Sequence, residues 1–299
     1  MDILLIFVNI VIFLALAPLF EGVIRKLTAK VHSRQGPPVV QPYYDVLKLL
    51  GKENLVTGNL GFKMAPVIAL ASILTAIALI PLGFRENFLT QYADIITIIY
   101  LLTLGGVAIL LGGLASRNTY GVIGASREMI TMIMVEPVLA MSFIMGAVKT
   151  RSLGLDSTMY STLGSGYSWS LALMLLVFIM ALQAFVGRQP FDIAEAEQEI
   201  MEGAFIEYSG PNLGLFKLYK MLKQMFYAVL FVTIFMPFLK TGFFIADVAI
   251  QLVEVLVVIV LIAVLGSTNP RLRIDQAVKY FAVLIFLSLA AVGLSVYGI

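Results

Sequence analysis

Six carboxylates lie within one sixteen-residue stretch of an otherwise apolar sequence. The stretch is part of GRQPFDIAEAEQEIMEGAFIEYSGP, residues 187–211, and it holds a third of all acidic residues: Asp192, Glu195, Glu197, Glu199, Glu202 and Glu207. Closely spaced carboxylates can hold and exchange protons, or they can simply keep a helix soluble. Because this acidic stretch directly joins two long apolar segments, we favour a role in moving protons.

Local signals predict a helix over residues 193–208. Asp192 followed three residues later by Glu195 matches a capping box after Pro190, and Gly210-Pro211 is typical of a helix end. One face of this helix would carry a stripe of carboxylates: Asp192, Glu195, Glu199 and Glu202.

Glu197 falls on a different face of that expected helix. It shares this face, which should pack, with Ile193, Ile200 and Ala204. A carboxyl in an apolar setting holds its proton more tightly and can exchange it near neutral pH. A fully solvated acidic helix is the alternative.

Other acidic residues lie inside apolar segments. Glu254 is near the middle of one, where a charge costs about 2.5–3.5 kcal/mol or more. Asp247 and Gln251 precede it at helical spacing, so the three should form one polar stripe that faces other helices.

Glu21 and Glu136 extend this pattern toward the acidic stretch. Glu21 lies at the end of the first apolar segment, and Glu136 lies about two turns into the fourth. Intramembrane carboxylates usually mark ion routes, so we predict a proton ladder that ends at Glu254. Hydrogen bonds between helices are the alternative, and they suffice for Gln183 and Tyr100.

The composition identifies the elements that must position these residues as membrane-spanning helices. The chain has 299 residues, is 60% hydrophobic and 13% charged, and has a mean hydropathy of +0.98. Soluble proteins are about 45–50% apolar and about 25% charged. We predict an all-α integral membrane protein, a single polytopic domain over residues 1–299 with eight transmembrane helices. These lie at roughly 3–24, 64–82, 92–114, 129–148, 169–187, 217–239, 244–266 and 276–297.

The Lys and Arg residues predict an orientation. All except Arg85, Lys149, Arg151 and Lys240 lie in or near the connections after the first, third, fifth and seventh spans. Positively charged connections stay on the cytoplasmic side. We therefore expect both termini outside, and large cytoplasmic loops at residues 25–63 after the first helix and 188–216 after the fifth.

The first of these loops contains a second polar motif, HSRQGPPVVQPYYDVLKLLGKENL. Gly36-Pro37-Pro38 predicts an extended or turned backbone. Asp45 can then cap a short amphipathic helix that ends at Gly51, with an apolar face of Val46, Leu47, Leu49 and Leu50. Such a helix can anchor in lipid head groups or form a docking surface for a cytoplasmic partner.

Three motifs in order resemble those of the complex I subunit 1 family, which includes the H subunits of NADH-quinone oxidoreductases. They are RQPFDIAEAEQEIMEGAFIEYSGP, SRQGPPVVQPYYDVLKLL and YGVIGASREMITMIMVEP, and the similarity covers nearly the whole chain. The family also includes membrane subunits of group 4 energy-converting NiFe hydrogenases, formate hydrogenlyase and a related sulfur-reducing membrane complex. Quinone-reducing members tend to read RxGPNRxGxxGxLQ. Residues 34–42 read RQGPPVVQP instead, which is similar to the hydrogenase type.

The resemblance implies a non-redox, ion-translocating anchor of a ferredoxin-linked respiratory complex in a prokaryotic plasma membrane, inactive alone. Its partners would be hydrogenase-like large and small subunits on the cytoplasmic face and antiporter-like subunits in the bilayer. The NiFe centre and iron–sulfur clusters would lie in these partners. This chain has no cysteine and a single histidine, so we expect no metal site in it.

The resemblance also implies roles for individual residues. The docking surface for the peripheral arm would comprise His32, Arg34, Gly36, Pro37, Gln41, Asp45, Arg188, Pro190 and Phe191. The proton pathway would comprise Glu21, Glu136, Asp192, Glu195, Glu197, Glu199, Glu202, Glu207, Asp247 and Glu254.

Two alternative functions stay open at this point. The chain could be the quinone-binding subunit of a complex I-type oxidoreductase, with the two loops bounding a quinone pocket. It could also be a stand-alone secondary transporter, although inverted repeats and matching broken helices are not apparent. The sequence leaves open the terminal acceptor (protons, sulfur species or quinone) and the transported ion, H⁺ or Na⁺.

Overall fold

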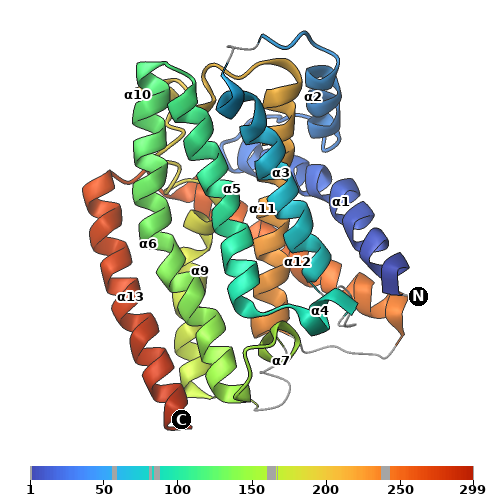
Figure 1. Ribbon diagram of the computed structural model, residues 1–299, viewed down its shortest axis with the longest axis vertical. Coiled ribbons are helices and arrows are strands. Elements are labelled where there is room, and N and C mark those ends of the chain that lie inside the picture. The colour runs from blue at the N-terminus through green and yellow to red at the C-terminus, as the bar shows by residue number, and fades with distance from the viewer. Residues whose placement is uncertain are drawn as a thin grey trace.

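The chain folds into a bundle of long helices (Figure 1). The computed structural model describes residues 2–55, 59–80, 83, 88–159, 166, 168–236 and 243–298, without the side chains of residues 2–4 and 91. Within these residues, eight helices are long and apolar enough to cross a membrane, as predicted. They are α1 (Asp2–Val31), α3 (Leu60–Leu79), α5 (Ile95–Ala115), α6 (Thr119–Thr150), α9 (Trp169–Val186), α11 (Gly210–Phe235), α12 (Phe244–Thr268) and α13 (Ile274–Val296).

Short helices lie in the connections. They are α2 (Gln41–Leu50), α4 (Phe88–Tyr92), α7 (Leu155–Met159), α10 (Glu197–Ile200) and the 3₁₀-helix η1 (Gly203–Phe205). In Figure 1, α2 and α10 lie at one end of the bundle, and α7 and the C-terminus lie at the other. The described residues contain no β-strand, only an isolated bridge between Asp94 and Gly154.

Helix α11 lies at the centre of the bundle. It packs against α1, α3, α9 and α12, and also against α2. Near its C-terminal end, the rings of Phe231 and Phe235 contact the ring of Phe178 of α9. The ring centroids are 5.8 and 5.3 Å apart, respectively. Close packing of this kind stabilises helix bundles in lipid, where the hydrophobic effect contributes little to helix association.

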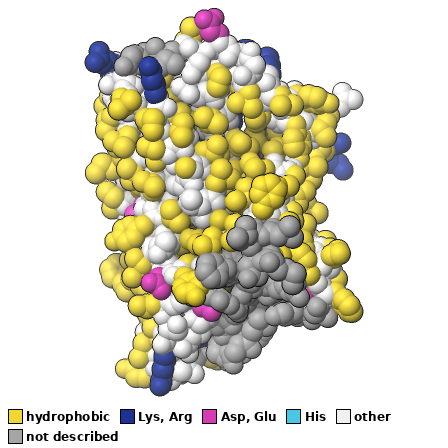
Figure 2. Space-filling view, turned by 45° about the vertical axis from the view of Figure 1, so that its right-hand side comes forward, with side chains coloured by type: hydrophobic (Ala, Val, Ile, Leu, Met, Phe, Trp, Pro, Cys, Tyr) yellow, Lys and Arg dark blue, Asp and Glu magenta, His cyan; other side chains and the backbone are white. Residues whose placement is uncertain are grey.

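The outer surface is apolar around the middle of the bundle. Figure 2 shows hydrophobic side chains across the middle of one face, with Lys and Arg side chains toward its upper and lower ends. Exposed apolar side chains of this kind include Val257 on α12, and Val283 and Phe286 on α13. Apolar side chains around long helices are those of a multi-pass membrane protein.

Helices α3, α6 and α11 begin four or more residues earlier than predicted, so the loops before them are shorter. Asn118 caps α6, where its side chain accepts a hydrogen bond of 2.9 Å from the backbone N–H of Tyr120. Helix α11 begins at Gly210, with Pro211 in its first turn. Since α1 also continues through Val31, both the 25–63 and the 188–216 loops lose residues to helices.

The helix predicted over residues 193–208 is wrong. Only α10 and η1 form there, and between them Met201 and Glu202 adopt positive φ angles of 50° and 67°. The predicted capping box is also absent, because Asp192 pairs with Arg271 instead. Tertiary packing decides this conformation, since Ala204 and Phe205 are buried against neighbouring helices.

Helix α2 differs from its prediction in where it starts. It begins at Gln41 with a proline in its first turn, so Asp45 lies inside the helix and does not cap it. It ends at Gly51 as predicted. The expected apolar face is divided, because Val46 is buried whereas Leu47 and Leu50 are exposed.

Candidate functional site

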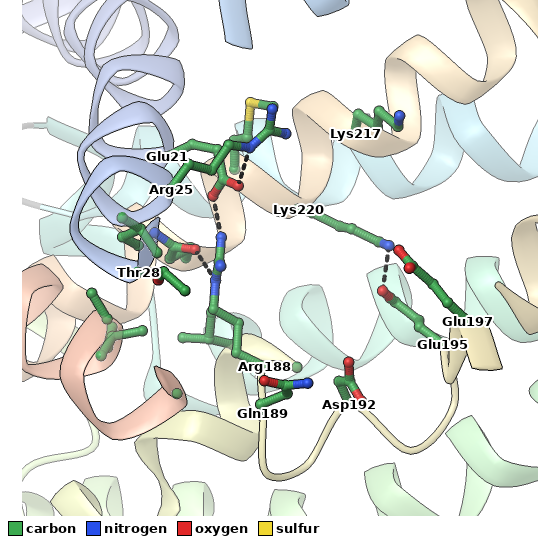
Figure 3. A pocket seen from close by; sticks show the side chains of 18 of the residues that line it. Glu21, Arg25, Thr28, Arg188, Gln189, Asp192, Glu195, Glu197, Lys217 and Lys220 are labelled. Carbon is green, nitrogen blue, oxygen red and sulfur yellow. Dashed lines mark hydrogen bonds and ion pairs between the residues drawn. The ribbon is translucent and has the colours of Figure 1, made fainter. Parts of the chain in front are cut away.

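A cavity of ≈390 Å³ lies between α1, the acidic stretch, α11 and α12 (Figure 3). Charged side chains of both signs line it. They are Glu21 and Arg25 from α1, Arg188, Asp192, Glu195, Glu197 and Glu202 from the acidic stretch and its approach, and Lys217 and Lys220 from α11. Carboxylates predicted for a proton pathway therefore share one space with basic residues from two other segments.

Glu21 is the most buried acid in this cavity. Its Oε1 accepts a hydrogen bond of 3.1 Å from Nε of Arg25, and its Oε2 accepts one from Nη2 of Arg188. Arg188 also donates from Nε to Oε1 of Gln224 on α11, at 2.7 Å. The side chain of Glu21 is only 10% exposed, so two guanidinium groups balance a nearly buried charge.

Arg25 connects this group to α2. Its Nη1 donates to Oδ2 of Asp45 at 2.8 Å, and Nε2 of Gln41 donates to the other Asp45 oxygen at 3.2 Å. Burial raises the pKa of Asp45, but the hydrogen bonds from Arg25 and Gln41 outweigh it and leave the pKa below its usual range. Sequence motifs far apart in the chain thus meet around one ion-pair network.

The carboxylates of the acidic stretch have separate partners. Glu195 accepts a hydrogen bond of 2.5 Å from Nζ of Lys220. Glu199 pairs with Arg127 of α6 at 2.7 Å, and this pairing lowers the pKa of Glu199. Glu207 accepts a hydrogen bond of 2.6 Å from the side chain of Asn118. These bonds fasten the stretch to α6 and α11.

Glu197 does not lie on a packing face, and that prediction is wrong. Ile193, Ile200 and Ala204 are buried as expected, but Glu197 and Glu202 are exposed because the predicted helix does not form. In Figure 3 the side chain of Glu197 points toward the Lys220–Glu195 pair at the cavity.

Asp192 joins the acidic stretch to the connection between α12 and α13. Nε of Arg271 lies 2.6 Å from Oδ1 of Asp192, and Nη2 of Arg271 donates a hydrogen bond of 2.9 Å to Oδ2. Burial raises the pKa of Asp192, and the Arg271 hydrogen bond offsets only part of this effect.

Two predicted docking residues face the interior of this chain. The carbonyl of Pro190 accepts a hydrogen bond of 3.0 Å from the N–H of Leu272, and the Gln189–Pro190 peptide is cis. Phe191 is buried, and its ring packs against Tyr280 and Phe281 of α13.

The remaining docking residues lie at the end of the bundle beside α2. His32, Arg34 and Gly36 are exposed and Pro37 is half-buried. The ring Nε2 of His32 lies 3.3 Å from the carbonyl oxygen of Ser267, which joins this segment to the end of α12.

The acids inside the helices are all partly or fully buried. Asp247 and Gln251 are buried on α12, and Gln251 bonds to the N–H of Gly83 at 2.7 Å and to Thr233 of α11 at 3.3 Å. Glu254 is half-buried, and within the described residues its Oε2 has no hydrogen-bond partner. The prediction that this stripe faces other helices is confirmed for Asp247 and Gln251.

Glu136 lines a small cavity of ≈50 Å³ between α5, α6, α9 and α11. Of the two polar residues with expected structural roles, Gln183 donates to the carbonyl of Ile262 at 2.9 Å, as predicted. Tyr100 is 69% exposed and faces outward instead of bonding between helices.

Sequence reasoning missed the basic partners and one acid. The structure adds Arg25, Lys220, Lys223, Arg271 and the acid Glu128. Glu128 falls just outside the predicted fourth span, which begins at residue 129. Asn118 as a helix cap is the signal that could have extended that helix.

Comparison with known protein families identifies the family of this chain. Residues 3–296 match the NADH dehydrogenase family. The chain belongs to this family. Its membrane-spanning helices and acidic stretch are therefore those of a membrane subunit of the type found in complex I-like and group 4 hydrogenase-type complexes.

Some relatives of this chain are named as subunits of hydrogenase-type complexes. The chain is 35% identical over 272 residues to "Hydrogenase-4 component C" of Escherichia coli (strain K12), covering 88% of this chain and 86% of that one. It is 31% identical over 306 residues to "Formate hydrogenlyase subunit 4" of the same organism, covering 97% and 100%. The H subunit of NADH-quinone oxidoreductase from Thermomicrobium roseum is 31% identical over 305 residues, covering 91% and 88%.

A solved structure has the same fold. The chain superimposes with a TM-score of 0.84 on a chain of the membrane-bound sulfane sulfur reductase, an archaeal respiratory membrane complex. The two are 26% identical, and the alignment covers 97% of this chain and 99% of the other. The resemblance drawn from the sequence motifs is confirmed at the level of the family.

Proposed function

We propose that this chain is the ion-translocating membrane anchor of a ferredoxin-linked hydrogenase-type respiratory complex in a prokaryotic plasma membrane. It would dock the peripheral redox arm, whose hydrogenase-like large and small subunits would carry the NiFe centre and iron–sulfur clusters. It would couple their electron transfer to H⁺ or Na⁺ movement, together with antiporter-like membrane subunits. The hydrogenase-4, formate hydrogenlyase and sulfane sulfur reductase relatives support this assignment.

Docking is supported by the shared location of the first-loop motif and the acidic stretch. The network of Glu21, Arg25, Asp45 and Arg188 joins them at the end of the bundle. A partner that contacts exposed Arg34 or α2 would lie close to the same ion pairs. Because Lys and Arg gather in these connections, we place this end on the cytoplasmic side.

Coupling is supported chiefly by one observation, the succession of carboxylates from the cavity into the helices. Glu195 lies at the cavity, Glu136 lines a smaller cavity within the bundle, and Glu254 is half-buried on α12. Carboxylates inside a membrane-spanning bundle are energetically costly, and those that occur there usually mark ion or proton pathways.

The proposal is tested by Glu254→Gln in the native complex, reconstituted into vesicles. We expect hydrogenase activity with a soluble dye to stay within about twofold, whereas coupled ion uptake falls by at least about tenfold. Exposed Glu53→Gln is the matched control and should change neither. Full ion uptake in Glu254→Gln and in Glu136→Gln would contradict the coupling role.

A quinone-binding role is the second candidate, because several relatives are named as H subunits of NADH-quinone oxidoreductases. The cavity beside α1 is the place where a quinone would bind in that case. Its charged lining and the Glu21–Arg188 pair across it favour water and ions over an apolar ring. Quinone that copurifies with the complex, or inhibition by a quinone-site inhibitor, would favour this second role.

A further inference from the structure

Lys223 of α11 shares one small cavity with two half-buried acids of α6, Glu128 and Glu136. It is one turn after Lys220 on α11, so both lysines project from the same side of that helix. Lys220 has its own partner, Glu195. Lys223 lines the ≈50 Å³ cavity together with Glu128 and Glu136.

A second cavity, of ≈30 Å³, adjoins the first. Glu128, Thr131 and Lys223 line both, and the second also reaches Phe191, which directly precedes the acidic stretch. A cavity can hold a water molecule above about 10–15 Å³ if polar groups line it. Both cavities are larger than this and are lined by Glu128, Thr131 and Lys223. Water can therefore connect these side chains where they do not touch directly.

The spacing of the acids suits a shared cation. Glu128 and Glu136 are eight residues apart on one helix, a rise of about 12 Å. Lys223 interacts electrostatically with both. In the part of the chain that the structure describes, it forms a direct ion pair with neither. A flexible lysine side chain between them can approach either acid.

The charge balance of this group limits its protonation states. Lys220 and Glu195 face Glu128 from the cavity side, but they neutralise each other, and Tyr227 faces Glu136. Lys223 can neutralise one carboxylate, and a second ionised carboxylate would leave an uncompensated charge among helices. The group is neutral when Glu128 and Glu136 together hold one proton.

We propose that Lys223 is the counter-ion that lets Glu128 and Glu136 share a single proton, and that it thereby positions a proton-transfer step between the acidic stretch and the helix interior. This deepens the coupling role proposed above and rests on it. In the step, the carboxylic acid of Glu128 releases its proton to cavity water, and the carboxylate of Glu136 takes one up. Lys223 keeps its own charge and moves toward the carboxylate that forms.

One test measures coupling in the reconstituted complex. We expect Lys223→Gln to reduce coupled proton uptake at least about tenfold, with soluble-dye activity unchanged and partial rescue by Lys223→Arg. Exposed Lys279→Gln on α13 is the matched control. Infrared difference spectra should show one protonated carboxyl shared by Glu128 and Glu136 in the native complex and two in Lys223→Gln.

A second test does not depend on transport. The double variant Glu128→Gln, Glu136→Gln strands the Lys223 cation, so adding Lys223→Met should raise its melting temperature. If the triple variant melts lower than the double variant, or if Lys223→Gln keeps full coupling and the native carboxyl spectrum, the inference is wrong. Loss of coupling in Glu136→Gln with full coupling in Lys223→Gln would refute the inference alone. Full coupling in Glu254→Gln and Glu136→Gln would refute the proposed function.

Discussion

Two aspartates, Asp192 at the cavity and Asp45 beside it on α2, have pKa values shifted in opposite directions. Asp45 is half-buried beside Arg25 and Gln41, whose hydrogen bonds favour its charged form. Asp192 pairs with Arg271, but burial has the larger effect and favours the neutral form. The contribution of each aspartate to stability must therefore depend on pH with opposite sign.

We expect Asp45→Asn and Asp192→Asn to change the pH dependence of stability in opposite directions. Because the folded-state pKa of Asp45 is depressed, its contribution is full above the unfolded value of about 3.9 and is lost as pH falls through the folded pKa. Because the folded-state pKa of Asp192 is raised, the contribution of Asp192 to stability is greatest below about pH 3.9. This contribution falls as pH rises through the folded pKa. Melting temperatures of both variants and the native protein, measured from about pH 3 to pH 6, check this. Equal slopes for the two variants would contradict it.

Arg188 joins two helices through its guanidinium, and its backbone lies just after a third, α9. It donates to Glu21 of α1 and Gln224 of α11. Arg188→Gln should destabilise the protein by about 1.5–3 kcal/mol, since hydrogen bonds to a nearly buried carboxylate are lost. Exposed Arg34→Gln should stay within about 0.5 kcal/mol. Additive effects of Arg188→Gln and Glu21→Gln on stability would show that the two residues are not coupled.

The acidic stretch holds its shape by lying directly on α6. A Cβ added at Gly124 would lie 2.5 Å from the backbone nitrogen of Ala204 and 2.7 Å from Cα of Gly203. Both are backbone atoms, which cannot move aside as a flexible side chain can. The absence of a side chain at Gly124 therefore allows α6 and the acidic stretch to touch.

Gly124→Ala should separate the stretch from α6. We expect a loss of about 1–3 kcal/mol from overpacking, and faster amide hydrogen exchange over residues 194–209. Gly293→Ala on α13 is the control, because nothing lies within 4 Å of its added Cβ, and it should be neutral or slightly stabilising. Unchanged exchange in Gly124→Ala would show that this contact does not hold the stretch.

The same elements show what the sequence can predict. Apolar length is a local property, so the sequence predicts all eight spans, but it does not predict their ends. Helix α6 continues through Arg127, whose charge resembles a loop signal and is instead paired with Glu199. Helix α11 begins at Gly210, seven residues before the predicted start at 217. The helix predicted over residues 193–208 does not form because contact with Gly124 overrides its local signals. The partners of Asp192, Glu195, Glu199 and Glu207 lie 25 to 89 residues away in the sequence, beyond any local pattern.

At the scale of the whole molecule, the two ends of the bundle differ. One carries α2, α10 and the ion-pair network, and the other carries α4 and α7 (Figure 1). The distribution of Lys and Arg predicts that the first end faces the cytoplasm.

The absence of cysteine from the sequence makes this orientation directly testable. Exposed Lys52, after α2, and exposed Ser152, after α6, can each be replaced by a single cysteine. In right-side-out vesicles an impermeant maleimide should label Ser152→Cys and spare Lys52→Cys, and inverted vesicles should give the reverse. Labelling of Lys52→Cys from outside would overturn the assignment.

The central position of α11 also has a consequence for biosynthesis. Its mean hydropathy of 1.3 is below the 1.8 to 3.0 of the other seven spans, and 83% of its most apolar stretch is buried by its neighbours. Three lysines in its first fourteen residues make its transfer from the translocon into lipid unfavourable by itself. One neighbour that covers it, α12, is synthesised afterwards. We therefore expect α11 to integrate only once α12 has emerged, so a nascent chain truncated after Phe235 should stay exposed to quality-control proteases.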